Sequence, residues 1–156
     1  KKNILENAFK ETEKSVGGNR LQLFASIHDV DVFNDSKATV IQAVEAAVNE
    51  LGKKYSSIIL IVGGQNKGVC RASAIKKIAS NKKVKSIISV GEHKDYKEHS
   101  IFAESMEVAV KSAFNFAKPG DAILFSPGGA SFDFYKNYEE RGQDFVRLVS
   151  LCTTSK

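Results

Sequence analysis

The chain has 156 residues, of which 42% are apolar, and a formal net charge of +5. That length suffices for one domain with a buried core, and no stretch approaches the roughly 20 apolar residues of a membrane span. The positive charge comes mostly from lysines that form no stripe with interleaved aromatic residues, which argues against a nucleic-acid-binding protein. No signal-peptide pattern begins the chain and the two cysteines lack C-x-x-C spacing, so we expect a cytoplasmic protein with reduced thiols and no membrane partner.

The N-terminal region divides into a polar segment and a pair of strands. Residues 1–18 contain few apolar anchors and end in two glycines, so we interpret them as a linker or as the tail of a preceding domain. The domain proper is expected to span residues 19–156. Apolar residues alternate with polar or small ones over 21–27, and an apolar stretch returns at 30–33 after a two-residue turn. This pattern predicts an antiparallel hairpin at a sheet edge.

Beyond the hairpin, strand and helix patterns alternate. The elements expected from these patterns are strands at 58–62, 84–90 and 122–125, helices at 40–52, 71–80 and 106–117, and a terminal helix that begins near Ser131. The segment 93–102 lacks a clear period, and we interpret it as a loop with a short helix. The alternation predicts an α/β, Rossmann-like three-layer sandwich, whose mostly parallel sheet carries the antiparallel N-terminal edge hairpin.

Three polar loops, at 34–39, 63–68 and 126–131, follow expected strands. Loops that follow parallel strands share the carboxyl edge of a sheet, where α/β folds bind ligands. The first loop combines an acid, two hydroxyls and an amine, contributed by Asp35, Ser36, Lys37 and Thr39. These residues suit an anionic ligand, but they also suit simple capping of the helix that follows.

The second and third loops are open to two interpretations each. Lys67 lies on a glycine-containing loop that lets a ligand approach the backbone, although an exposed loop lysine is the simpler interpretation. The loop is not a P-loop, because Val69 and Cys70 follow its second glycine. Ser131 is expected at a helix N-terminus, where it would hold a carboxylate or merely cap the helix. No histidine or acid is spaced to activate Ser131, so a serine hydrolase is rejected.

Other polar residues carry weaker signals. His93 and His99 lack the spacing of metal ligands, so no metal site is predicted. Tyr138 is expected two turns into the last helix, in the core or at the rim of the site. The charged cluster 139–141 is interpreted as a solvated helix face.

The polar motifs together resemble those of one family. The matching stretches are Asn34-Asp35-Ser36-Lys37-Ala38-Thr39, Gly63-Gly64-x-x-Lys67, Ser126-Pro127-x-x-Ala130-Ser131-x-Asp133 and Lys136-Asn137-Tyr138-x-x-Arg141-Gly142. They resemble the C-terminal domain of the Mur ligases, in particular of the members that add D-glutamate to UDP-N-acetylmuramoyl-L-alanine. The resemblance covers nearly the whole chain, from about Asn19 to its end.

The resemblance implies a function in peptidoglycan precursor synthesis, and thus in cell-wall biogenesis, cell shape and cell division. The family's enzymes are ATP-dependent ligases in which ATP phosphorylates the L-alanine carboxylate and the amine of D-glutamate attacks the acyl phosphate. They have three domains, and the central one holds most of the ATP and Mg²⁺ contacts. This domain would bring D-glutamate and close over ATP, so it would be inactive without the N-terminal and central domains.

The resemblance also implies contacts with D-glutamate. Thr39 and Lys67 would hold one of its carboxylates, and Ser131 with the backbone near Tyr138 would hold the other. A dicarboxylate needs cationic or N–H partners at both ends, and each such charge-assisted hydrogen bond contributes about 1.5–3 kcal/mol.

On the nucleotide side, Asp35 would lie near ATP and Arg20 near its phosphates, a contact that suits the charged fork of donors on a guanidinium. Asn19 would also lie on the ATP side, at a position where the family usually has histidine. Two other functions stay open on the residues alone: a stand-alone α/β module that binds a small anion or nucleotide without ligase activity, and a lysine-rich nucleic-acid binder with steeply salt-dependent affinity. An upstream G-x-x-x-x-G-K-[ST] motif in the same gene would favour the ligase.

Overall fold

The computed structural model describes residues 21–91, 95–131 and 134–153, which contain a six-stranded sheet and the helices packed on it. The strands are β1 (Gln22–Ile27), β2 (Val30–Asn34), β3 (Ile58–Gly63), β4 (Val84–Val90), β5 (Ile101–Ala103) and β6 (Ala122–Phe125). The helices are α2 (Ile41–Gly52), α3 (Ala72–Ala79), α4 (Met106–Phe116) and α5 (Tyr138–Cys152). The linker or tail expected at residues 1–18 lies outside the described residues, so it stays a prediction.

The first two strands form the hairpin that the alternating pattern predicts. β1 and β2 pair in the antiparallel sense, with Ile27 opposite Val30 next to the turn. The two turn residues, His28 and Asp29, have positive φ angles of 51° and 62°, which is the conformation that a type I′ hairpin turn requires. β1 is an edge strand of the sheet.

The rest of the sheet is parallel, as predicted. Its order is β1-β2-β6-β3-β4-β5, and every neighbouring pair except β1–β2 runs in the same direction. β3 lies inside the sheet with all of its residues buried, which explains its uninterrupted apolar sequence. Ile59 and Ile61 face one core, and Ile58, Leu60 and Val62 face the other.

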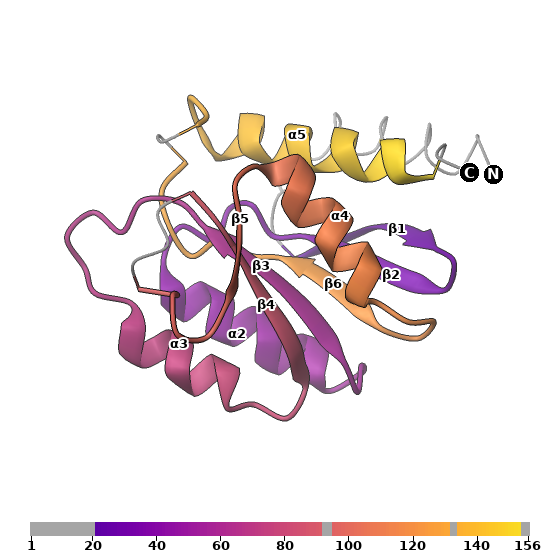
Figure 1. The fold of residues 1–156 in the computed structure, drawn as a ribbon, viewed down its shortest axis with the longest axis horizontal. Coiled ribbons are helices and arrows are strands. Elements are labelled where there is room, and N and C mark those ends of the chain that lie inside the picture. The colour runs from indigo at the N-terminus through magenta and orange to yellow at the C-terminus, as the bar shows by residue number, and fades with distance from the viewer. Residues whose placement is uncertain (1–20, 92–94, 132–133, 154–156) are drawn as a thin grey trace.

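The three layers are visible in Figure 1, where α4 and α5 cover one face of the sheet and α2 and α3 cover the other. The core between the sheet and α4–α5 contains Phe24, Val110 and Phe145, and the core on the other side contains Val44 and Ile75. The predicted α/β three-layer sandwich is therefore confirmed. In the ranges that the structure describes, no helix combines the length and apolar character needed to cross a membrane.

Two sequence-based expectations about local structure are wrong. The first concerns the segment 93–102, where a loop with a short helix was expected. Ile101–Ala103 form β5, which pairs in parallel with Ile88–Val90 of β4 at the second edge of the sheet. Ile101 and Phe102 are 47% and 51% exposed, so burial does not alternate along this strand and no sequence period marks it. The strand is defined by its pairing with β4.

The second correction concerns the start of the last helix. α5 begins at Tyr138 and not near Ser131, and the side chain of Asn137 caps it by accepting a hydrogen bond from the N–H of Glu140 at 2.8 Å. Ser131 instead opens a separate turn, in which its carbonyl accepts the N–H of Tyr135 at 2.9 Å. Tyr138 is thus the first residue of α5, not a residue two turns into it.

Candidate functional site

The three polar loops lie side by side at the carboxyl edge of the sheet, at the left in Figure 1. They follow β2, β3 and β6, and β6 lies between the other two strands. The loops after β2 and β3 lead to helices on one face of the sheet, whereas the loop after β6 leads to α5 on the other face. Such a reversal of direction opens the crevice in which α/β folds bind ligands.

Backbone hydrogen bonds join the three loops into one unit. The N–H of Gly128 donates to the carbonyl of Ala38 at 2.8 Å, which ties the β6 loop to the β2 loop. Gln65 and Ala130 exchange two hydrogen bonds of 2.9 Å each, which tie the β6 loop to the β3 loop. The loops that carry Thr39, Lys67 and Ser131 are consequently held in a common arrangement, although these residues are far apart in the sequence.

A buried arginine on α5 reinforces this arrangement. Arg141 is 3% exposed, and its guanidinium donates to the carbonyl of Gly129 and to that of Ser36, both at 2.9 Å. It therefore bridges the β6 and β2 loops from α5, the helix that follows the β6 loop. The interpretation of residues 139–141 as a solvated face is wrong for Arg141, because it lies on the inner face of α5, one turn before the buried Phe145.

A second buried arginine, Arg71, was missed by sequence reasoning. It is 2% exposed, and its Nη1 donates to the carbonyls of Gly64 at 3.1 Å and Gly128 at 3.3 Å. Its Nε lies 3.2 Å from a carboxylate oxygen of Asp95. Burial by itself would raise the pKa of Asp95, but the hydrogen bonds from Arg71 and Asn66 outweigh it and lower that pKa below its ordinary value. The carboxylate is thus kept charged beside the guanidinium.

The glycines of these loops serve the close approach of one loop to another. A Cβ on Gly64 would lie 2.4 Å from the carbonyl oxygen of Ala130 and 2.9 Å from the guanidinium of Arg141. A Cβ on Gly129 would lie 2.7 Å from the carbonyl oxygen of Gly63. Only a residue without a side chain fits between such backbones.

The residues expected to bind D-glutamate lie on this framework. Thr39 and Lys67 are exposed, and Lys67 adopts an uncommon positive φ of 49°. Ser131 is 3% exposed, and it is not at a helix N-terminus as its sequence position suggested. Tyr138 is half-buried, and its carbonyl accepts the hydroxyl of Ser36 at 2.6 Å. The ammonium of Lys37 lies 5.9 Å from the centre of the Tyr138 ring.

The residues expected near the nucleotide are only partly described. Asn19 and Arg20 lie outside the described residues. Asp35 is 4% exposed, and one of its oxygens accepts the N–H of Leu21 at 2.9 Å while the other accepts the hydroxyl of Ser126 at 2.8 Å. Asp35 therefore joins the start of β1 to the end of β6, and it presents little surface to a ligand.

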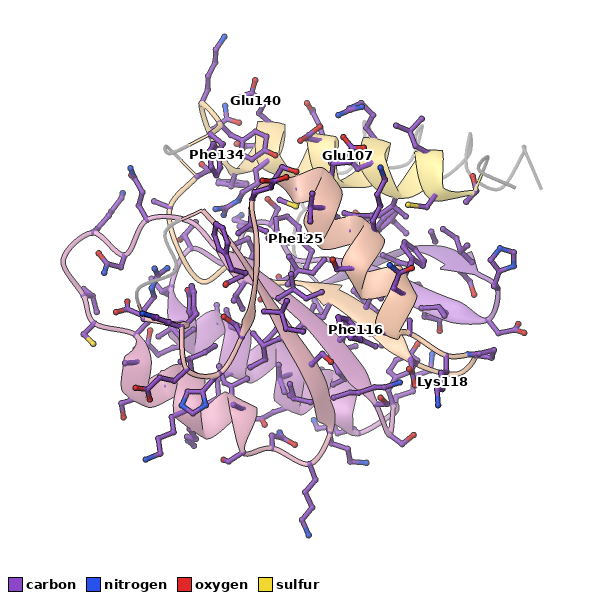
Figure 2. All side chains as sticks on the ribbon, viewed as in Figure 1. Glu107, Phe116, Lys118, Phe125, Phe134 and Glu140 are labelled. Carbon is purple, nitrogen blue, oxygen red and sulfur yellow. The ribbon has the colours of Figure 1, made fainter. Side chains whose placement is uncertain are left out.

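A mostly apolar pocket opens beside the loops, on the α4–α5 side of the sheet. Its lining includes Gly64, Val90, Met106, Phe134 and Arg141. Figure 2 shows Phe134 near Glu140, whereas Phe125, the last residue of β6, also lines the pocket and is labelled nearer the middle of the view. In the part of the chain that the structure describes, no three His, Cys, Asp or Glu side chains gather to hold a metal ion.

Comparison with known proteins connects this site to a family. The family described as "Mur ligase, glutamate ligase domain" matches residues 19–129. The chain is 44% identical over 134 residues to the UDP-N-acetylmuramoylalanine--D-glutamate ligase of Shewanella violacea, an alignment that covers 83% of this chain and 29% of that protein. The ligase of the same name from Aquifex aeolicus is 38% identical over 142 residues, with 86% and 33% covered. The chain thus spans about a third of the length of these relatives.

Solved structures agree with the fold. MurF ligase from Thermotoga maritima, crystallised with ADP, matches with a TM-score of 0.59 at 12% identity, over 85% of this chain and 30% of that one. A murein peptide ligase from Psychrobacter arcticus matches with a TM-score of 0.59 at 17% identity, over 84% of this chain and 30% of that one. From the extent of the family match and the identity to its curated relatives, the chain belongs to the Mur ligase family, in which it corresponds to the glutamate ligase domain.

Proposed function

We propose that this chain is the C-terminal, D-glutamate-binding domain of an ATP-dependent ligase that joins D-glutamate to UDP-N-acetylmuramoyl-L-alanine in peptidoglycan precursor synthesis. The observation that carries the proposal is the hydrogen-bonded union of the β2, β3 and β6 loops, because each of them bears one of the motif residues Thr39, Lys67 and Ser131. The names of the curated relatives support the same substrate.

The proposed binding mode uses both ends of the dicarboxylate. Lys67 and Thr39 are exposed at the edge of the sheet and hold one carboxylate of D-glutamate. Ser131 and the backbone at Tyr138 hold the other. Tyr138 opens α5, and the N–H groups in the first turn of a helix have no intrahelical acceptor, so this part of the site attracts an anion.

The proposed nucleotide contacts place this domain at one side of a shared site. Asn19 and Arg20 approach ATP, and Asp35 acts by anchoring Leu21, the residue that follows Arg20 in the sequence. The described residues contain no P-loop and no group of metal ligands, so ATP and Mg²⁺ are held mainly by the central domain of the whole ligase. The N-terminal and central domains are thus the partners of this chain, and residues 1–18 are the connection to them.

A division of labour of this kind predicts that the chain alone does not turn over. A coupled ADP-release assay with D-glutamate and the UDP-linked substrate is expected to give the background rate. Turnover by this chain in isolation would contradict the proposal.

The direct test is Lys67→Ala in the whole ligase. Loss of one charge-assisted hydrogen bond, worth about 1.5–3 kcal/mol, is expected to raise the KM for D-glutamate about tenfold to a hundredfold. Lys82→Ala is the matched control, because Lys82 is another exposed lysine but lies in the turn between α3 and the start of β4, away from the site. Equal KM values for wild type, Lys67→Ala and Lys82→Ala would remove Lys67 from the site.

A further inference from the structure

A fourth loop contributes to the carboxyl edge, although no motif pointed to it. It follows β4, and its described residues are Gly91 and those from Asp95 onward. The side chain of Asp95 is 7% exposed and accepts the backbone N–H of Arg71 at 3.1 Å as well as its Nε at 3.2 Å. The same carboxylate accepts the side-chain amide of Asn66 at 3.3 Å. Asn66 directly precedes Lys67, so Asp95 contacts the Lys67 loop on both sides of the lysine.

Arg71 closes the loop that Asp95 holds. The loop begins at Gly63–Gly64 and ends at Arg71, whose Nη1 donates back to the carbonyl of Gly64 at 3.1 Å and across to that of Gly128 at 3.3 Å. The guanidinium lies 4.6 Å from the ring centre of Tyr96, the residue after Asp95. The two ends of the Lys67 loop, the β6 loop and the β4 loop thus meet at one buried cation.

The Arg71–Asp95 ion pair is expected to stabilise the fold no more than apolar side chains of similar size would. A buried ion pair gains little over apolar packing, since both charges lose their hydration. In addition, Nη2 of Arg71 is buried and has no hydrogen-bond partner among the described residues, which leaves its desolvation uncompensated. What the pair does achieve is geometric. Lys67 has a positive φ of 49° in a tight turn that the N–H of Val69 closes by donating to the carbonyl of Asn66 at 3.1 Å, and Asp95 fixes that turn by accepting hydrogen bonds from Asn66 before it and from Arg71 after it.

We propose that Arg71 and Asp95 are positioning residues that hold the Lys67 loop in the conformation that places the Lys67 ammonium against a carboxylate of D-glutamate. The inference rests on the proposed function. It assigns a role in substrate affinity to two buried residues, one of them on a loop outside the family motifs. Neither residue touches the substrate: Asp95 acts through the side-chain amide of Asn66, and Arg71 acts through the backbone carbonyl of Gly64.

The test is Asp95→Asn in the whole ligase, alone and combined with Lys67→Ala. Asparagine keeps the shape and one acceptor oxygen but loses the charge that faces Arg71. We expect the KM for D-glutamate to rise about fivefold to tenfold, while kcat stays within about twofold and the KM for ATP is unchanged. In the Lys67→Ala background, the same substitution is expected to add less than about twofold, because the lysine whose position it controls is gone.

Two further variants separate positioning from general destabilisation. Asp121→Asn removes the partner of a similar ion pair, Lys85–Asp121, at the opposite edge of the sheet, and it is expected to lower Tm without changing the KM for D-glutamate. Asn66→Ala leaves the Arg71–Asp95 pair in place and removes the amide that donates to Asp95, together with the oxygen that accepts the N–H of Gly68 at 3.0 Å. It is expected to raise the KM about twofold to threefold in the presence of Lys67 and not in its absence. If Asp95→Asn does not fold, Asn66→Ala carries the test.

The outcomes discriminate between the two proposals. If Lys67→Ala leaves the KM for D-glutamate unchanged, the proposed function fails. If Lys67→Ala raises the KM but Asp95→Asn and Asn66→Ala do not, or if their effects multiply fully with that of Lys67→Ala, the positioning role of Arg71 and Asp95 is wrong while the proposed function stands.

Discussion

The connections at the two ends of the parallel strands, the carboxyl edge and the amino edge of the sheet, are packed differently. At the carboxyl edge the loops cross so closely that a Cβ on Gly129 would lie 2.7 Å from the carbonyl oxygen of Gly63. At the amino edge, Gly120 has nothing within 4 Å of its Cβ position, and only its φ of +93° requires glycine. Ionic groups differ likewise: the side chain of Arg71 is 2% exposed, whereas that of Lys85 at the amino edge is 34% exposed.

Packing is therefore tighter at the carboxyl edge than at the amino edge. The connections at the amino edge are turns joined by backbone hydrogen bonds: the N–H of Gly120, between α4 and β6, donates to the carbonyl of Asp29 in the hairpin turn at 2.7 Å. Lys118 lies in this region, at the lower right of Figure 2 and away from the polar loops. The carboxyl-edge loops are joined in addition by the buried side chains of Arg71 and Arg141, so the exposed Lys67 and Thr39 lie on a buried framework. Substitutions at the two edges should therefore differ in both stability and substrate affinity.

The largest effect is expected for Gly129→Ala. Its Cβ would also lie 2.4 Å from Nη1 of Arg71, and neither that buried side chain nor the Gly63 backbone can move away, so we expect a loss of about 3 kcal/mol or more. Gly120→Ala is the control, with about 1–2 kcal/mol from backbone strain alone. Urea denaturation of the two variants measures the difference. Equal losses of unfolding free energy in the two variants would contradict the close packing around Gly129.

Arg141→Lys should rank next. Lysine cannot donate to the carbonyls of Gly129 and Ser36 together, so one buried acceptor is left unsatisfied, at a cost of about 1–3 kcal/mol. Because Arg141 joins the β2 and β6 loops, the KM for D-glutamate in the whole ligase should rise as well. A stability loss with an unchanged KM would separate the framework from the site.

Acid should weaken both edges, and Asp121→Asn tests the amino edge. Burial alone would raise the pKa of Asp121, but the N–H of Lys118 and the ammonium of Lys85 outweigh it and hold that pKa below its ordinary value of 3.8. A lowered carboxyl pKa stabilises the fold above pH 3.8, and that stability disappears as the pH falls through the lowered value. The variant should be less stable than wild type by about 1–2 kcal/mol at pH 7, a gap that closes below the ordinary pKa. A gap that persists at low pH would argue against the charge.

The smallest effect is expected for Tyr55→Phe at the amino edge. The Tyr55 hydroxyl donates to the carboxylate of Asp31, and the loss of this single hydrogen bond should cost about 1 kcal/mol. The KM for D-glutamate should not change, because Tyr55 precedes β3 at the edge opposite the site. An altered KM would show that the two edges communicate.

Part of the candidate site was predictable because its signals are local. Asp35, Lys67 and Ser131 each stand just after a predicted strand, and parallel strands bring such positions to one edge. The start of α5 was predicted too early because Phe134 continues the apolar spacing of the helix. In the structure Asn137 caps the N-terminus of α5, so the helix does not extend back to Phe134, which is 60% exposed.

Arg71 and Asp95 could not be predicted in the same way. Sequence patterns predict that an arginine at the end of a polar loop is exposed to solvent. Its burial follows from the position of Asp95, 24 residues later, and of the Gly128 carbonyl, 57 residues later. For Arg141 the cue was its spacing of four from Phe145 on one helical face, which competed with the charged Glu139 and Glu140 beside it.

The amino-acid sequence by itself determined the α/β class, the edge hairpin and the three polar loops, because these follow from periodicity and from the local chemistry of turns. The tertiary structure alone decided how the loops cross, that two arginines are buried between them, and that a fourth loop contacts the loop that carries Lys67. The physical reason is that burial of a charge depends on partners brought together only when distant strands pair, and no local pattern records those partners.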